Sequence, residues 1–273
     1  MTIIDAHTHI FPEKIAQAAV EATAEFYENA IPGHPMSKES MIHHDGMAEE
    51  LLSAGKAGGI GKFLVFSTAT TPRQVESVNN FIARQCEAHP EFIGAGTMHI
   101  DYPDFEKEVD RAKTLGLVGI KLHPDIQRFR LDDERLFPLY EILGSRHMFL
   151  VAHTGDYRYE FSNPKRMEKI AKLFPQTKFI GAHFGGWSEW DVARDLLVLD
   201  NVYVDTSSTY GFTGPEAMKK AFTTFDPTHI FFGSDYPMWD PAVELGTIYE
   251  LGLTDDQLEG VLGRNFERFL KEL

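Results

Sequence analysis

Near its start the chain reads Ile3-Ile4-Asp5-Ala6-His7-Thr8-His9, a short apolar run that ends in two histidines two positions apart. In a β-strand, residues i and i+2 point to the same face. The two imidazoles are therefore expected to project together from the end of one rigid strand, as two ligands of a divalent metal ion would. Asp5 is expected to orient a ligand histidine or to fix the strand, and a role in packing alone is the alternative.

Seven further short apolar segments follow, and segments with helical character separate them. The eight predicted strands cover residues 3–9, 62–67, 92–98, 117–123, 148–153, 178–183, 202–205 and 230–235. Helices are predicted at 13–29, 46–57, 72–89, 104–115, 133–146, 164–174, 189–199 and 215–224, with 30–45 irregular and the C-terminal remainder helical. Continuous apolar runs are typical of parallel strands that are buried on both faces.

This alternation predicts a closed (β/α)8 barrel, a TIM barrel, built as one domain of residues 1–273. An open, doubly wound sheet is the structural alternative. Its dinucleotide-binding form has no support, because no Gly-x-Gly-x-x-Gly motif follows a predicted strand.

The composition narrows the class of protein. With 43% hydrophobic and 25% charged residues the chain reads as an ordinary globular protein. Its formal net charge of −15, from 41 acidic and 26 basic residues, argues against a nucleic-acid partner. The single cysteine, Cys86, excludes an internal disulfide and is expected to be a structural thiol within a helix.

No apolar run reaches the roughly 18 residues of a membrane-spanning helix, and no signal-peptide pattern opens the chain. The candidate metal ligands start only a few residues into the chain, which leaves no room for a removable leader. We therefore expect a cytoplasmic protein with a small-molecule substrate and no membrane partner.

Polar side chains with metal-binding chemistry stand at the ends of the predicted strands. They are His7 and His9 on the first strand, Lys121 and His123 on the fourth, His153 on the fifth, His183 on the sixth and Asp235 on the eighth. In a closed barrel these ends meet at the C-terminal mouth, where barrel active sites lie. Histidine and aspartate are ligands of zinc, iron and manganese, so the sequence predicts a metal centre there.

Five motifs resemble those of the amidohydrolase superfamily. They are Asp5-Ala6-His7-Thr8-His9, Gly119-Ile120-Lys121-Leu122-His123-Pro124, His153-Thr154-Gly155, His183-Phe184-Gly185-Gly186 and Gly233-Ser234-Asp235-Tyr236-Pro237. They are most similar to the amidohydrolase-related branch, which also holds non-oxidative decarboxylases such as aminocarboxymuconate-semialdehyde decarboxylase and resorcylate decarboxylase. The resemblance extends from the first strand to Leu262-Gly263-Arg264-Asn265.

The resemblance implies that one divalent ion is held by His7, His9, His153 and Asp235. Zinc is the expected ion, with manganese and iron(II) as alternatives. His183 would then be a catalytic histidine that donates a hydrogen bond to developing negative charge. Asp235 would be the second catalytic residue, taking the proton of a metal-bound water as general base.

Lys121 leaves two alternatives open. The strand-4 lysine is carboxylated and bridges two metals in dinuclear members of the superfamily, so a second ion is expected only if Lys121 is carboxylated. Otherwise a free Lys121 could bind an anionic group of the substrate. His123 is a candidate for contact with substrate or metal, or for support of the rim, and Arg158 is a candidate partner of a substrate carboxylate.

Further candidates for the rim of the site lie near the predicted strand ends, and their aromatic rings suggest a site for an apolar or aromatic ring. They are Phe11, Asp156, Trp187, Asp205, Tyr236 and Trp239. Three loop histidines, His34, His43 and His44, could touch the substrate but are more simply explained as solvated loop residues.

Three functions fit these residues. The leading hypothesis is a metal-dependent hydrolase that cleaves a C–O or C–N bond of a lactone, ester or amide, because the chain is short for a decarboxylase. The alternative is a metal-dependent, non-oxidative decarboxylase of a small carboxylic acid, which the branch resemblance favours. A non-catalytic metal-binding protein is the third, and the presence of both Asp235 and His183 argues against it. A homodimer is compatible with each.

Overall fold

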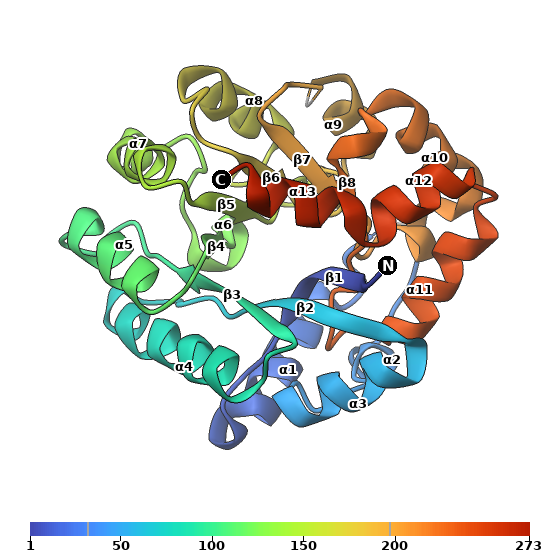
Figure 1. Ribbon diagram of the computed structural model, residues 1–273, viewed down its shortest axis with the longest axis horizontal. Helices are drawn as coiled ribbons and strands as arrows, with labels where there is room; N and C mark the ends of the chain where they lie inside the picture. Colours follow the sequence, from blue (N-terminus) through green and yellow to red (C-terminus); the bar gives the residue numbers. More distant parts are fainter. Residues whose placement is uncertain (32, 197) are drawn as a thin grey trace.

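The strands form one parallel sheet in the order β1 to β8 in a computed structural model, which describes residues 1–31, 33–196 and 198–273. Their bounds are β1 Ile3–His9, β2 Ile60–Phe66, β3 Phe92–Thr97, β4 Gly119–Leu122, β5 Phe149–Ala152, β6 Phe179–Gly181, β7 Val202–Asp205 and β8 Ile230–Phe231. The ring closes between its two ends, because Ala6 N donates to Phe232 O at 2.8 Å and Thr8 bridges to Tyr236 in parallel. The predicted (β/α)8 barrel is confirmed (Figure 1).

The larger helices alternate with the strands and lie outside the ring in Figure 1. The helices of the described ranges, large and small, have these bounds: α1 Glu13–Tyr27, α2 Lys38–Met41, α3 Ala48–Gly58, α4 Val75–Ala88, α5 Phe105–Thr114, α6 Pro124–Gln127, α7 Phe137–Ser145, α8 Pro164–Leu173, α9 Trp190–Leu196, α10 Tyr210–Thr224, α11 Pro241–Glu250, α12 Asp255–Glu259 and α13 Asn265–Lys271. Short 3-10 turns precede α4, α7 and β8.

The helix predictions differ from the structure in several places, among them the short helix α6, which lies outside every predicted helix. Residues 30–45, predicted to be irregular, contain the short helix α2, which Ser37 caps through its side chain. Helix α10 starts five residues before the predicted position, but it breaks at Gly214, where φ is 74°, so the predicted start marks its second part. Of the predicted segments, Pro32 and Leu197 lie outside the described residues.

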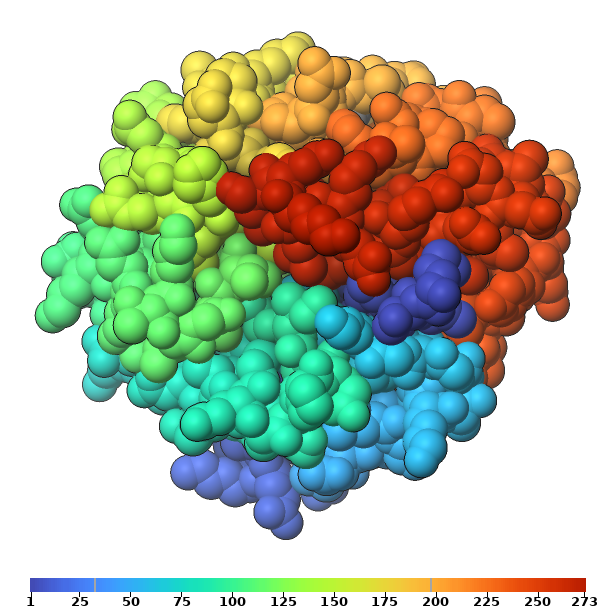
Figure 2. Space-filling model, in the orientation of Figure 1, coloured from blue at the N-terminus to red at the C-terminus, as the bar shows by residue number. Residues whose placement is uncertain are grey.

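Two of the apolar clusters among the described residues build the barrel. One fills the space between the strands and the surrounding helices. The other fills the barrel interior, where Phe266 and Phe269 of α13 pack against Phe231 and Phe149 with ring centroids 5.1 Å apart in each pair. Phe149 is the first residue of β5, so α13 covers the N-terminal ends of the strands. Figures 1 and 2 show this C-terminal segment (red) lying across the near face of the barrel.

Several strands end earlier than predicted, and the polar residues lie just beyond them. β6 ends at Gly181 and β8 at Phe231, whereas strands to His183 and Asp235 were expected. His183 has a φ of 59° and Asp235 a φ of 66°. This left-handed conformation is incompatible with a strand and uncommon for residues other than glycine. The prediction of strands through these two residues was therefore wrong.

None of the helices in the described ranges has the length and apolar character needed to cross a bilayer.

Candidate active site

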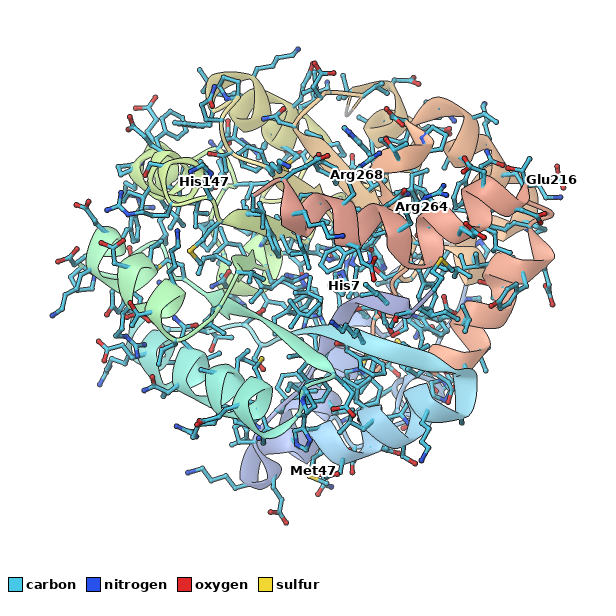
Figure 3. The ribbon with its side chains drawn as sticks, viewed as in Figure 1. His7, Met47, His147, Glu216, Arg264 and Arg268 are labelled. Carbon is cyan, nitrogen blue, oxygen red and sulfur yellow. The ribbon has the colours of Figure 1, made fainter. Side chains whose placement is uncertain are left out.

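Three of the predicted ligands meet at the C-terminal mouth of the barrel. Nε2 of His7 lies 3.4 Å from Oδ1 of Asp235, and Nε2 of His9 lies 3.5 Å from the same oxygen. A tetrahedral ion with bonds of about 2.1 Å has its ligand atoms about 3.4 Å apart. The side chains of His7, His9 and Asp235 therefore fit a divalent metal ion by donor chemistry and by spacing. Figure 3 shows His7 near the centre of the ring of strands.

The protonation of this group suits metal binding. Burial lowers the pKa of His7 to about 4, and the nearby Lys121 ammonium adds to the effect. Burial also lowers the pKa of His9. Burial alone would raise the pKa of Asp235, but the hydrogen bond from His9 and the charges of His7 and His183 hold it well below its usual range. Near neutral pH the group therefore offers two neutral imidazoles and one carboxylate.

Asp205, at the end of β7, fixes the tautomer of His7. Its Oδ2 lies 2.8 Å from His7 Nδ1, so Nδ1–H donates to the carboxylate and Nε2 keeps its lone pair for the site. The other oxygen, Oδ1, accepts from the backbone N–H of His183 at 3.1 Å. Burial opposes the ionisation of Asp205, but the charge and hydrogen bond of His7 dominate and lower its pKa to about 2.

His153 and His183 are in direct contact in the same pocket. Nδ1 of His153 lies 3.0 Å from Nε2 of His183, whose Nδ1 lies 2.8 Å from Ser207 Oγ. Nε2 of His153 has no hydrogen-bond partner in the described residues and lies 3.7 Å from Oδ2 of Asp125. By donor distances, His153 groups with Asp125 and Asp156 instead of with the group of His7.

Lys121 lies fully buried beside His7. Its Nζ is 3.1 Å from His7 Nε2 and 4.7 Å from the centre of the Phe66 ring. Burial lowers the pKa of Lys121 to about 8, against the opposing charges of Asp235 and Asp205. Lys121 lines the pocket, and its ammonium group can pair there with an anionic group of a ligand.

His123 faces the pocket and helix α1 together. Its ring stacks on that of His153, with centroids 4.2 Å apart and an angle of 8° between the planes. Its Nε2 lies 2.8 Å from the hydroxyl of Tyr27, the last residue of α1. His123 therefore connects the end of β4 to the helix over the mouth.

Arg158 holds α1 in place. Its guanidinium donates to both carboxylate oxygens of Asp156, at 3.0 and 2.7 Å, and to the carbonyl of Phe26 at 2.7 Å. The guanidinium also lies over the ring of Phe26, 4.8 Å from its centre. Arg158 is not among the residues that line the pocket, and its donors already have protein acceptors.

The cavity at the mouth has a volume of about 240 Å³, below the roughly 300–1,000 Å³ of drug-sized sites. One wall comes from α1, where the lining residues Ala19, Ala22, Thr23, Phe26 and Tyr27 repeat at helical spacing. Phe11, Ile126, Pro237 and Met238 add to the apolar lining. The pocket therefore fits a small molecule with one polar end and one apolar end.

The other predicted rim residues take supporting positions. Trp187 packs on Tyr27 with ring centres 4.8 Å apart. Trp239 donates to Ser208 Oγ at 2.7 Å, and Ser208 in turn donates to Asp235. The hydroxyl of Tyr236 points to the carbonyl of Met47, 3.0 Å away. None of His34, His43 and His44 is among the residues that line the pocket.

Sequence reasoning missed four residues around this site: Tyr27, Asp125, Ser207 and Ser208. Each contacts one of the predicted residues: His123, His153, His183 and Asp235, respectively. Ser207 and Ser208 come two and three residues after the end of β7, so the rule that polar residues at strand ends line the barrel mouth could have found them. Nothing in the local sequence singles out Tyr27 within its helix.

This fold and this donor group define a class of barrel enzymes whose site lies at the C-terminal mouth. The chain belongs to the amidohydrolase family, because the family model described as Amidohydrolase matches residues 4–271. The resemblance read from the five motifs is thereby confirmed.

Solved structures with similar folds include three enzymes of known or assigned name. 5-Carboxyvanillate decarboxylase from Sphingomonas paucimobilis is 17% identical, with a TM-score of 0.75 over 99% of each chain. 2,6-Dihydroxybenzoate decarboxylase from Rhizobium is 14% identical, with a TM-score of 0.73 over 100% of this chain and 99% of the other. A protein from Pseudomonas putida, named provisionally as a 2-pyrone-4,6-dicarboxylic acid hydrolase, is 15% identical, with a TM-score of 0.68 over 99% and 97%. At these identities the likeness establishes the fold.

Proposed function

We propose that the protein is a metal-dependent, non-oxidative decarboxylase of a small aromatic carboxylic acid. The observation that carries the proposal is the pocket itself, in which His7, His9 and Asp235 share a small cavity with an apolar wall from α1. Two of the three similar structures reported above are decarboxylases of hydroxylated aromatic acids. This support favours the decarboxylase over the hydrolase that the sequence put first.

We propose that His7, His9 and Asp235 hold one divalent ion and that His153 completes the ligand set. When bound, such an ion supplies positive charge that holds a substrate carboxylate and its neighbouring oxygen. A related dihydroxybenzoic acid decarboxylase from Polaromonas contains manganese and the inhibitor 2-nitroresorcinol. Zinc stays the ion predicted from the sequence, and manganese is the alternative to test beside it.

The chain's own residues supply the rest of the chemistry. Lys121 can pair with the carboxylate at the floor of the pocket. Loss of CO2 breaks the bond between ring carbon and carboxyl carbon and leaves its electron pair on the ring, where a proton from the pocket replaces the carboxyl group. His183, held by Ser207, is the proposed donor to the negative charge that develops. The ionised Asp235 is the proposed carrier of the proton, which it takes from a water molecule and passes to the ring carbon, leaving hydroxide.

Hydrolysis is the second candidate. The Pseudomonas putida structure supports it, and so does the carboxylate of Asp235, which can act as a general base on a water molecule. The length of the chain does not favour hydrolysis, because 99% of the Sphingomonas decarboxylase chain aligns with this chain. A cytoplasmic location and a homodimer stay predictions.

The first experiment measures metal content per chain in protein purified without chelators. One equivalent supports the single site and an unmodified Lys121. Two equivalents support a carboxylated Lys121 and favour hydrolysis. The metal-loaded protein is then given a panel of aromatic monocarboxylic acids and lactones, with CO2 release and proton release recorded in parallel and Asp235→Asn as the inactive control. Proton release without CO2 release on every compound contradicts the decarboxylase proposal.

A further inference from the structure

We propose that Tyr27, delivered over the barrel mouth by α1, is a substrate-binding residue whose hydroxyl proton is donated to an oxygen atom of the substrate. The inference deepens the proposed function and rests on it for the choice of ligand. It starts from the hydrogen bond between Tyr27 and His123, where the oxygen of the hydroxyl lies 2.8 Å from Nε2 of the imidazole.

The direction of this hydrogen bond follows from the other side of the His123 ring. His123 caps the N-terminus of α6, where its Nδ1 accepts the backbone N–H of Ile126 at 3.4 Å. An imidazole nitrogen that accepts a hydrogen bond carries no proton, so this contact excludes both the Nδ1–H tautomer and the doubly protonated ring. The proton of His123 is therefore on Nε2, and Nε2–H donates to the oxygen of Tyr27.

The hydroxyl of Tyr27 then acts as an acceptor toward His123 and still has its own proton to donate. Within the described residues, its oxygen has no hydrogen-bond partner besides His123. Burial raises the pKa of Tyr27 well above its usual value, and the charges of Asp156 and Asp125 add to this effect, so the hydroxyl stays protonated. The hydroxyl is partly buried and faces a mainly apolar cavity, so a ligand that displaces water there makes the missing acceptor costly unless one of its own oxygens takes the proton.

The surroundings of Tyr27 indicate where such an oxygen would come from. Tyr27 lines the cavity together with His9, Asp235 and Lys121. A ligand that contacts the metal-binding group can therefore also accept the hydroxyl proton of Tyr27. Thr68, also on the cavity wall, has a buried hydroxyl without a hydrogen-bond partner in the described residues. Within the described residues, the pocket therefore presents two hydroxyl protons without a protein acceptor, those of Tyr27 and Thr68, between apolar walls. This matches an aromatic ring that carries oxygen substituents or a carboxylate.

Tyr27 is also held rigidly enough to select a ligand. Its ring packs against Trp187, with centroids 4.8 Å apart, and edge-to-face against Phe26, with centroids 4.9 Å apart. Arg158 anchors the same turn of α1 through the carbonyl of Phe26. Because several side chains fix the ring, the position of its hydroxyl is set before a ligand arrives, and the donor is pre-organised.

The first test needs neither substrate nor activity. Long-range ¹⁵N–¹H correlation spectra of histidine-labelled protein report which ring nitrogen carries the proton, and His123→Gln identifies the His123 signals by their loss. The expected result is a neutral His123 with the proton on Nε2. A proton on Nδ1 would overturn the proposal, because Tyr27 would then donate its proton to His123 and have none for a ligand.

The second test measures binding of 2,6-dihydroxybenzoate, the acid bound in one of the similar decarboxylase structures, to metal-loaded protein by calorimetry. Tyr27→Phe keeps the ring and removes the hydroxyl, so the Kd is expected to rise about tenfold or more, as for a lost hydrogen bond to a charged group. Tyr159→Phe is the matched control, since Tyr159 stacks on Phe26 outside the pocket. Metal affinity is expected to stay unchanged in both variants.

Equal affinity of Tyr27→Phe and the unmodified protein for this acid would overturn the inference. If the unmodified protein binds no aromatic acid of the panel, the proposed substrate class fails instead. The tautomer of His123 is measured without any ligand, so it decides separately whether the Tyr27 proton is free. The two failures are thereby distinguished.

Discussion

Nδ1 of His7 lies 2.8 Å from Oδ2 of Asp205, and both side chains are completely buried. This one contact links the carboxyl ends of β1 and β7 and decides which nitrogen of His7 faces the pocket. A carboxylate behind a metal-binding histidine orients the ring and raises its basicity. Asp205 therefore orients the ring of His7 toward the pocket, although it is not one of the three residues, His7, His9 and Asp235, that are spaced to bind a metal ion.

Replacing Asp205 with Asn tests this link. The amide removes the charge that holds the Nδ1–H of His7, and metal affinity is expected to fall about 10- to 100-fold. Competition with a chromophoric chelator measures that affinity. Asp133→Asn is the control. Asp133 caps a 3-10 turn and is not among the residues that line the pocket, so this change should leave metal affinity unchanged. Unchanged affinity in Asp205→Asn would show that the orientation of His7 is set elsewhere.

His153 and His183 contact each other at 3.0 Å, yet we expect different losses when each is removed. His153→Ala should abolish tight metal binding, because it removes a proposed ligand. His183→Ala should keep the metal and lose turnover, because it removes the proposed donor to developing charge. Elemental analysis after dialysis, together with the CO2 assay, separates the two. Loss of metal from His183→Ala would reverse these roles.

Arg158 and Asp156 form an ion pair on which the placement of α1 depends. Arg158→Met leaves the fully buried carboxylate of Asp156 without its partner, so the free energy of unfolding should fall by about 3 kcal/mol. The double variant Arg158→Met/Asp156→Asn should lose less than the sum of the single changes. Urea unfolding measures these energies, with Arg194→Met, whose partner Asp191 is exposed, as the control that should change stability little. Additive losses would contradict a coupled pair.

The sequence was a good guide where short-range pattern decides the structure. The apolar runs identified every strand, and the ends of those runs located His7, His9, Lys121, His183 and Asp235 around one pocket. The strand ends were misjudged because a residue with positive φ leaves no mark in an apolar pattern. Such a conformation depends on the hydrogen bonds of the whole rim.

The contacts between distant elements could not be predicted in the same way. Tyr27 and His123 are separated by 96 positions, and an aromatic residue on a helix is ordinarily a packing residue. Arg158 was a candidate partner of a substrate carboxylate, with a solvated or interface arginine as the simpler interpretation. In the structure its guanidinium pairs with Asp156, a carboxylate of the chain itself. Which partner an arginine takes depends on the tertiary arrangement, since the side chain is long and its donors point in several directions.

Glu244 of α11 gives a prediction for stability against pH. Burial raises its pKa from 4.5 to about 8, with a smaller contribution from the charge of Asp235. Between these two values the folded protein binds a proton that the unfolded chain has lost, so this residue makes stability fall as pH rises from about 4.5 to about 8. Glu244→Gln should remove that fall and be more stable than the unmodified protein by a few kcal/mol above pH 8. Urea unfolding at pH 5 and pH 8.5 measures the difference, and the exposed Glu141→Gln is the control. A stability gain at pH 8.5 no larger than at pH 5 would show that Glu244 is ionised in the folded protein throughout this range.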